Sequence, residues 1–148
     1  MKTTISYRGT IPVGEQERIR LKTNNGKTGY KITKFQIITT QPGAAGKSAE
    51  VIAQVFKTDQ TGLITDVIDF TNSDLMAVSF LGIESNGWNN DAIIIFDNEI
   101  TNQNMFITMT DSSGATVPTN YYLELETMAL NDLQATQLTL KNIRQVLS

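Results

Sequence analysis

The sequence predicts an all-β protein, an antiparallel β-sandwich followed by a C-terminal α-helix. Only 18% of the residues are charged, while Thr, Asn, Gln, Ile and Val are abundant, a composition typical of strands and turns rather than of helical bundles. Short alternating apolar and polar runs recur between Gly-, Asn- and Asp-rich turns, which favours a sandwich, with the jelly roll as one such arrangement. At 148 residues we expect a single domain, in which residues 1–130 form the sandwich and residues 131–148 add an amphipathic helix.

The first predicted hairpin joins residues 18–23, which alternate basic and apolar side chains, to a strand over residues 30–38. The sequence Asn-Asn-Gly at 24–26 lies between them and accepts the positive φ angles of a tight turn.

A second hairpin is predicted more strongly. Residues 49–57 and 63–70 are both rich in β-branched side chains, and Asp-Gln-Thr-Gly at 59–62 separates them. A type I turn followed by a glycine in the left-handed region would close this pair.

Three further strands are expected before the C-terminal region. Residues 73–81 are compatible with a strand or a short capped helix, and we favour the strand. Residues 92–96 are apolar on both faces, which predicts a central rather than an edge strand. Residues 104–110 alternate, with an apolar face formed by Met105, Ile107 and Met109.

The last strand and the helix are the clearest local signals. Residues 121–126 place Leu123 and Leu125 on one face and Glu124 and Glu126 on the other, so one face is expected to be dry and the other wet. Asn131 is a suitable helix cap, and Gln134 three residues later completes a capping box.

The predicted helix has an apolar side that needs a cover. From residue 132 to residue 147 there is no Gly or Pro, and apolar residues recur at helical spacing: Leu133, Leu140, Ile143 and Leu147. This side is expected to pack on its own sandwich or to dock on a neighbouring subunit. These four residues are therefore candidate interface residues.

Composition excludes several kinds of chemistry. The chain contains no Cys and no His, which removes disulfides, thiolate nucleophiles, Ser-His-Asp arrangements and histidine-bound zinc. We expect no enzymatic activity, cofactor or metal. The net charge of −3 does not favour direct nucleic-acid binding. The N-terminus lacks the apolar core of a signal peptide, and no run reaches the length of a membrane span, so no membrane partner is expected.

Two segments, one glycine-rich and one basic, are candidate ligand sites. Gly-Ala-Ala-Gly-Lys-Ser at 43–48 resembles a phosphate-binding loop, but Gln41 stands where the motif needs its first glycine, so a plain loop is favoured. Arg18, Arg20 and Lys22 form a basic stripe that could meet phosphates or an acidic partner; a solvated or edge-protecting face is the favoured interpretation.

Carboxylates are the remaining candidates for metal binding or acid/base catalysis. Asp91, Asp97 and Glu99 could supply oxygen ligands to Ca²⁺, but no EF-hand spacing is present and polar turns explain them more simply. Glu124 and Glu126 could be drawn as an acid/base pair for glycoside cleavage, although solvent-facing strand carboxylates commonly share such a face.

Trp88, the only tryptophan, lies in a polar loop between Gly87 and Asn89. Exposed tryptophan is enriched at interaction hot spots, which makes Trp88 a candidate interface residue. It could equally fold back as a lid on the core.

The C-terminal third resembles a known class of protein. The sequences Val-Pro-Thr-Asn-Tyr-Tyr-Leu-Glu-Leu-Glu at 117–126, Leu-Asn-Asp-Leu-Gln-Ala-Thr at 130–136 and Leu-Lys-Asn-Ile-Arg at 140–144 resemble the C-terminal region of small virion structural proteins of tailed phages, particularly marine ones. The resemblance implies a β-sandwich that assembles on a capsid or tail, made in the host cytoplasm and carried on the virion. It offers no catalytic or metal residue to carry over.

The expected function is therefore that of a capsid-associated decoration or cement protein, which binds the major capsid protein or another virion protein and forms a homo-oligomer. A tail or connector component is the alternative within the same class. From another class, a carbohydrate-binding sandwich remains open, in which Trp88 and its neighbouring Asn residues would contact a sugar.

Overall fold

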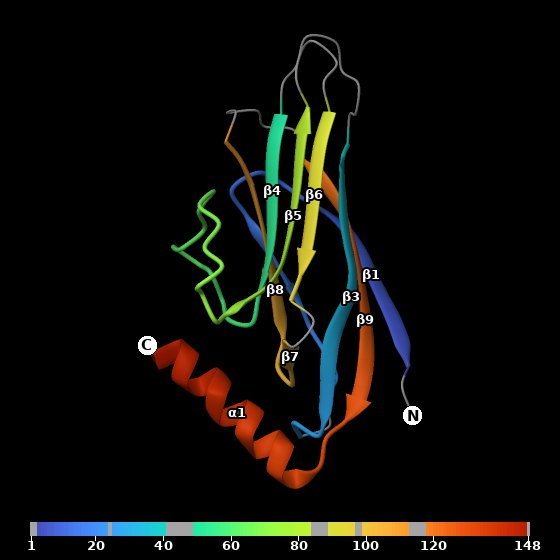
Figure 1. Cartoon of the computed structure of the whole chain (residues 1–148), viewed down its shortest axis with the longest axis vertical. Coiled ribbons are helices and arrows are strands. Elements are labelled where there is room, and N and C mark those ends of the chain that lie inside the picture. The colour runs from blue at the N-terminus through green and yellow to red at the C-terminus, as the bar shows by residue number, and fades with distance from the viewer. Residues whose placement is uncertain are drawn as a thin grey trace.

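Two antiparallel sheets pack face to face in the computed structural model, and a helix extends from one end of the sandwich (Figure 1). The structure describes residues 3–23, 25–40, 49–83, 89–96, 99–112 and 118–147, and for residues 49, 83, 89 and 142–147 it describes the backbone alone. The predicted fold class, an all-β antiparallel sandwich with a C-terminal helix, is confirmed.

The described elements divide into two sheets and one helix. Sheet A has the order β1 (Thr4–Ile11), β9 (Thr119–Ala129), β3 (Thr28–Thr39) and β7 (Ile100–Thr101). Sheet B has the order β2 (Gln16–Ile19), β8 (Met105–Asp111), β4 (Ala49–Phe56), β5 (Leu75–Ile83) and β6 (Asn89–Ile95). The helix α1 spans Asp132–Leu147.

The strand pairing is that of a jelly roll. When β6 is set aside, the first strand pairs with the last, the second with the next to last, and so on inward: β1 with β9, β2 with β8, β3 with β7 and β4 with β5. This is the pattern of one long hairpin wrapped into two four-stranded sheets. Strand β6 is an addition at the edge of sheet B, where it pairs with β5.

The main core lies between the sheets and is built by alternate residues of the facing strands. Strand β8 contributes Met105, Ile107 and Met109, and β9 contributes Leu123 and Leu125; all five are fully buried. Both faces predicted from alternation are confirmed. The polar residues of β9 lie on the opposite, outer face of sheet A, because successive side chains of a strand point to opposite sides.

The first predicted hairpin is wrong, although its turn forms. Asn25 and Gly26 have positive φ angles of 58° and 82°. However, β2 ends at Ile19 and pairs with β8 in sheet B, whereas β3 pairs with β9 in sheet A. The turn therefore carries the chain from one sheet to the other, a choice that local sequence does not encode.

The second predicted hairpin is also wrong beyond its turn. Gly62 has the predicted positive φ of 77°, but residues 63–70 form an irregular segment rather than a strand, and β4 pairs with β5 instead. Short side chains bond the backbone here: the Val67 amide donates to Thr65 Oγ1 at 3.1 Å, and the Thr71 amide donates to Asp69 Oδ1 at 2.9 Å. Such local bonds compete with a strand ladder.

The remaining strand predictions have different outcomes. Residues 73–81 largely form β5, as favoured. Residues 92–96 lie at the end of β6, an edge strand, so the prediction of a central strand is wrong. Strand β1 was not predicted, although Ile5, Tyr7 and Ile11 alternate toward the core.

Residues 57–74, called the cover segment below, lie over the outer face of sheet B. Gln54 is buried on that face, and its Nε2 donates to the carbonyls of Thr65 and Val67 at 3.3 and 3.4 Å. A second small apolar cluster, formed by β4, β5 and the residue after β6, joins Phe56, Leu75, Val78 and Phe96. Sheet B is thus packed on both faces.

Candidate protein interface

Exposed large apolar side chains gather on three elements at the periphery of the sandwich. The cover segment carries four, β6 two and α1 two, with exposed fractions of 39–67%: Leu63, Val67, Ile68, Phe70, Ile93, Ile94, Leu133 and Leu140. Clustered exposed apolar side chains mark interaction surfaces more often than isolated ones do. These elements are therefore the candidate interface.

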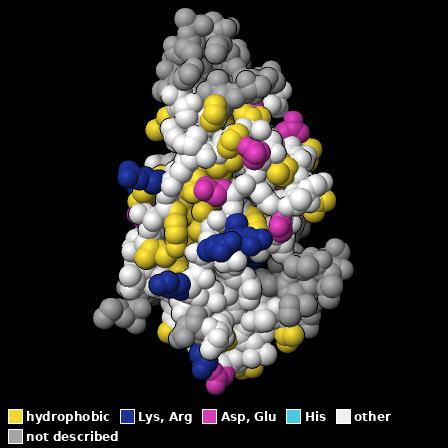
Figure 2. Space-filling view, turned by 180° about the vertical axis from the view of Figure 1, so that it is seen from behind, with side chains coloured by type: hydrophobic (Ala, Val, Ile, Leu, Met, Phe, Trp, Pro, Cys, Tyr) yellow, Lys and Arg dark blue, Asp and Glu magenta, His cyan; other side chains and the backbone are white. Residues whose placement is uncertain are grey.

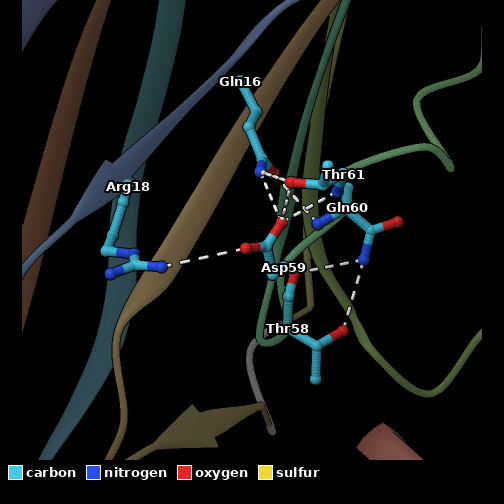
Figure 3. Close-up of polar contacts among 6 residues, drawn as sticks. All are labelled: Gln16, Arg18, Thr58, Asp59, Gln60 and Thr61. Carbon is cyan, nitrogen blue, oxygen red and sulfur yellow. Dashed lines mark hydrogen bonds and ion pairs between the residues drawn. The ribbon is translucent and has the colours of Figure 1, made fainter.

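A polar network fixes the start of the cover segment to β2 (Figure 3). Gln16 Nε2 donates to Asp59 Oδ1 at 2.5 Å and to Thr61 Oγ1 at 3.0 Å, while the Gln60 amide donates to Gln16 Oε1 at 3.0 Å. Hydrogen bonds from Thr61 and Gln16, with the nearby Arg18 guanidinium, lower the pKa of Asp59 to about 2. Asp59 is thus held as an anion that organises the turn.

Arg18 completes this attachment. Its guanidinium lies 3.8 Å from Asp59 Oδ2, and its Cζ lies 5.4 Å from the centroid of the Phe106 ring. The predicted basic stripe is therefore partly engaged within the chain, and Arg20 and Lys22 follow the end of β2 rather than continuing it.

A buried polar cluster lies where the two ends of the cover segment, Lys57 and Asp74, meet. The ammonium of Lys57 is fully buried and pairs with Glu99, whose Oε2 also lies 3.9 Å from Lys141 of α1. Asp74 is buried beside Lys57. Its Oδ2 accepts hydrogen bonds from the Thr58 hydroxyl and Gln60 Nε2, while its Oδ1 has no partner among the described residues. Burial raises the pKa of Asp74 above its ordinary value. This cluster joins the cover segment, the chain before β7, and α1.

The start of α1 is fixed by the predicted capping box. The Gln134 amide donates to Asn131 Oδ1 at 2.8 Å, and the Asn131 amide donates to Gln134 Oε1 at 3.1 Å. Both halves of the prediction are confirmed, and they satisfy amide groups that a helix start leaves free.

One buried side chain ties α1 to the sandwich. Asn102 Nδ2 lies within 3.2 Å of three acceptors: the carbonyls of Gly26 and Ala135, and Thr139 Oγ1. Among the helix residues whose side chains are described, Ala135 alone is buried, and the helix lies obliquely below the sheets rather than flat against one of them (Figure 1).

An apolar groove of about 280 Å³ lies between α1 and the ends of sheet A. Its wall comes from three elements or their flanks, and Lys141 lies at its polar side: Ile100, Met128, Ala129, Leu130, Gln134, Gln137, Leu138 and Lys141. The groove shows that α1 does not close fully on the sandwich.

The five predicted interface residues have different outcomes. Leu133 and Leu140 are 67% and 48% exposed, so these two side chains do not pack on the sandwich of their own chain. Ile143 and Leu147 lie in α1, but their side chains are outside the described part of the structure. Trp88 lies outside the described residues altogether. The sequence did not indicate the cover segment as a surface, because residues 59–62 predict a turn and residues 63–70 a strand.

The carboxylates considered for chemistry do not converge. Glu99 is paired with Lys57, Asp91 lies exposed on β6, and Asp97 is outside the described residues. Glu124 accepts a hydrogen bond from the Tyr122 hydroxyl at 3.2 Å on the outer face of sheet A. Within the residues that the structure describes, no three Asp, Glu, His or Cys side chains form a group able to hold a metal ion. The loop at 43–48 is also outside the described part.

The fold therefore defines the chain as an antiparallel jelly-roll sandwich with a C-terminal helix and a peripheral apolar surface. Neither a protein-family model nor a curated protein sequence matches it. None of the helical residues described forms a segment long and apolar enough to cross a membrane.

Proposed function

We propose that this chain is a virion structural protein, and more specifically a capsid-associated decoration protein that binds the major capsid lattice. It would be made in the host cytoplasm and would act by protein contacts alone. The observation that carries the proposal is the exposed apolar surface of the cover segment, β6 and α1.

This surface suits assembly because it lies on elements added to a rigid scaffold. The eight strands of the jelly roll supply a closed core, while the cover segment, β6 and α1 are additions to it. Interface energy is concentrated in a few apolar anchors surrounded by polar groups. Leu133 and Leu140 provide such anchors, with Gln137 and Lys141 on the same helix.

The fold is compatible with the proposal and does not single it out. Jelly rolls occur in viral capsid domains and in lectins, and a fold hosts many functions. The sequence resemblance of the C-terminal third to small phage structural proteins favours the first. The sugar-binding alternative depends on Trp88, whose surroundings are outside the described residues.

The test is co-sedimentation of the purified protein with capsids and, separately, with tails isolated from the virus that encodes it. Saturable binding to capsids, in a copy number set by the lattice symmetry, is the expected result. Binding to tails alone would assign the chain to the tail or connector instead. Binding to neither would overturn the proposal, and a glycan screen would follow.

A matched pair of variants locates the contact. Leu140→Asp changes an exposed side chain of α1, and Ile38→Asp changes an exposed side chain on the outer face of sheet A, where Ile38 is 60% exposed. The first is expected to weaken capsid binding by roughly tenfold or more, as truncated interface anchors do, and the second to leave it unchanged. Equal effects of the two substitutions would count against α1 as the binding element.

A further inference from the structure

We propose that β1 of one copy pairs with β1 of a second copy, antiparallel and edge to edge, so that the two A sheets become one continuous sheet. This inference goes beyond the proposed function and does not depend on it, because it concerns self-association alone. Two features of β1 carry the pairing: the direction of its backbone hydrogen bonds and the order of its side chains.

The first feature is an open row of backbone groups along β1. This strand is an edge of sheet A, and among the described elements it pairs with β9 alone, in an unbroken register from Thr4 to Ile11. The Thr127 amide donates to the Thr3 carbonyl at 2.8 Å, so Thr3 and the odd-numbered residues after it bond to β9. Because successive residues of a strand direct their backbone groups to opposite sides, the even-numbered residues point theirs away from the sheet: Thr4, Ser6, Arg8 and Thr10.

The hydrogen bonds on the other side of β9 agree with this direction. The Thr40 amide donates to the Pro118 carbonyl at 3.0 Å, and the Leu130 amide donates to the Lys27 carbonyl at 2.8 Å. The even-numbered residues of β9 therefore bond to β3, which leaves its odd-numbered residues to β1. The outward row of β1 thus needs an extended strand to satisfy it, as in β-strand addition.

The other edges of the two sheets are shorter or lie against another strand. β7 has two residues and β2 has four, so neither offers a ladder as long as β1. β6 has seven residues, but it lies against β3 of the opposite sheet. β1 has eight residues, no proline, no bulge and a single charged side chain, Arg8. Proteins usually protect an exposed edge of this length, so an open one predicts a partner strand.

The second feature is that the side chains of β1 are compatible with an antiparallel copy of themselves. Outward residues must face outward residues, and the register that sets Thr4 opposite Thr10 of the second copy uses the whole row. It also sets Ser6 opposite Arg8, so the two guanidinium groups do not face each other. Cross-strand threonine pairs are favourable, whereas like charges directly opposite are not. The same strand in a second copy is therefore a suitable occupant.

This contact is isologous, because the same strand contributes from both copies. The two-fold axis passes through the point where Tyr7 of one copy faces Tyr7 of the other. Such a contact satisfies the β1 edge of both copies at once, so it produces a closed dimer rather than a filament.

Cysteine pairing tests the register, because the natural chain contains no Cys. Position 4 of one copy would face position 10 of the other, whereas two copies of either position would lie six residues apart along the ladder, about 20 Å. A disulfide needs Cα atoms about 4.4–6.8 Å apart. Under mild oxidation, a mixture of Thr4→Cys with Thr10→Cys is expected to give a covalent dimer, and each variant alone is not.

The control is a mixture of Thr4→Cys with Ile38→Cys, which is exposed on the outer face of the same sheet but lies on β3. It should give only the cross-links of random collision. Self-cross-linking of Thr4→Cys as efficient as its cross-linking to Thr10→Cys would overturn the inference. The absence of specific cross-links would also overturn it.

Amide hydrogen exchange of the natural protein, followed by NMR, tests the hydrogen bonds without any substitution. Exchange of the Ser6 and Arg8 amides should slow by about tenfold or more between dilute and concentrated protein, because each gains an acceptor in the dimer. The amides of Ile5 and Tyr7 already bond to β9 and should not change in this way. Equal slowing at all four positions, or none, would contradict the pairing.

Ser6→Lys weakens the contact at a position that the single copy tolerates. Glu124 is directly opposite Ser6 in β9, so the added ammonium has an anion beside it within its own chain. Across the contact it would face Arg8 of the second copy. Light scattering should show dimerisation weakened by about fivefold or more, since like charges directly opposite are destabilising. Ile38→Lys is the matched control and should leave the dimer unchanged; an equal effect of both substitutions would count against the β1 contact.

The result can be separated from that for the proposed function. A dimer through β1 without binding to capsids or tails would support this pairing and refute the decoration role. Capsid binding by a chain that shows neither the cross-links nor the slowed exchange would refute the pairing and leave the decoration role intact.

Discussion

The outer faces of the two sheets differ in what covers them. On sheet A, Lys34 is directly opposite Glu124 and Lys31 is opposite Glu126, in neighbouring strands, and these side chains face water. Figure 2, a view of the molecule from behind, shows Lys and Arg side chains interspersed with Asp and Glu and with apolar ones. On sheet B, the outward-facing residues Ile52, Gln54 and Phe56 of β4 are buried, and the cover segment accepts hydrogen bonds from Gln54.

The burial patterns of β9 and β8 show this difference between the sheets. Strand β9 in sheet A alternates buried and half-buried residues from Tyr121 to Glu126, whereas β8 in sheet B is buried at five successive positions from Met105 to Met109. The cover segment lies over the outer face of sheet B, and its own large apolar side chains are exposed. An exposed apolar surface thus accompanies the covering of this sheet.

The largest expected effect comes from the same substitution on both outer faces. Ile52 of β4 is 7% exposed on the outer face of sheet B, and Ile38 of β3 is 60% exposed on the outer face of sheet A. Ile52→Ala should lower the free energy of unfolding by about 2–4 kcal/mol, and Ile38→Ala by less than about 1 kcal/mol. Urea denaturation of both variants measures the difference. Equal losses would mean that the cover segment does not shield sheet B in solution.

A smaller effect is expected at the buried ion pair beneath the cover segment. Glu99→Gln leaves the fully buried Lys57 ammonium without its anionic partner and should cost about 2–3 kcal/mol, since Glu99 itself is partly exposed. Lys141→Gln removes a half-exposed partner at 3.9 Å and should cost less than about 0.5 kcal/mol.

The test compares these two variants with the double variant Lys57→Met/Glu99→Gln by thermal and urea unfolding. The double variant should recover part of the loss because no unpaired ammonium stays buried, although the neighbouring Asp74 loses the cation beside it. A double variant as unstable as Glu99→Gln would show that the pair acts through packing rather than charge.

The smallest effects are pH dependences of opposite sign within the cover segment. The pKa of Asp59 is lowered from 3.8 to about 2, so its stabilisation is present above pH 3.8 and is lost as the pH falls toward 2. The Asp59 side chain is 46% exposed, so solvent screening should keep this term below about 1 kcal/mol. Burial raises the pKa of Asp74 above 3.8, so its contribution is lost as the pH rises through that raised pKa.

Urea unfolding at several pH values between 2 and 7 measures both terms. Asp59→Asn should flatten the rise in stability between pH 2 and 4, and Asp74→Asn should flatten the fall above pH 4. An Asp74→Asn variant with the slope of the natural protein would contradict the buried, ionisable state inferred for this carboxyl.

Local signals in the sequence predicted the elements that depend on local physics. The alternation of β8 and β9, the turn at Gly62 and the capping box of Asn131 and Gln134 are all confirmed, because each is a matter of neighbouring residues. Strand partners were not predictable in the same way. The turn at Asn25 and Gly26 is compatible with a hairpin, but burial of β2 and β3 in separate sheets overrides it.

For the same reason, the sequence predicted the part of the exposed apolar surface on α1 and not the part on the cover segment. Helical spacing pointed to Leu133 and Leu140, which are exposed. The β-branched residues at 63–70, within the cover segment, predicted a strand. Thr65 and Asp69 are instead a signal for side-chain turns, because each accepts a hydrogen bond from the amide two residues later. Such turns give an apolar segment a surface course that hydrophobicity alone does not reveal.

The pairing of the first strand with the last also sets the order of events during synthesis. The Thr3 amide donates to Thr127 Oγ1 across 124 residues of sequence, and β1 and β3 meet in sheet A through β9 between them. A ribosome must therefore release residue 129 before this sheet can close. Until then, β1 and β3 present open edges, and contacts this distant form slowly. The nascent chain should accordingly depend on chaperones until residue 129 has left the ribosome.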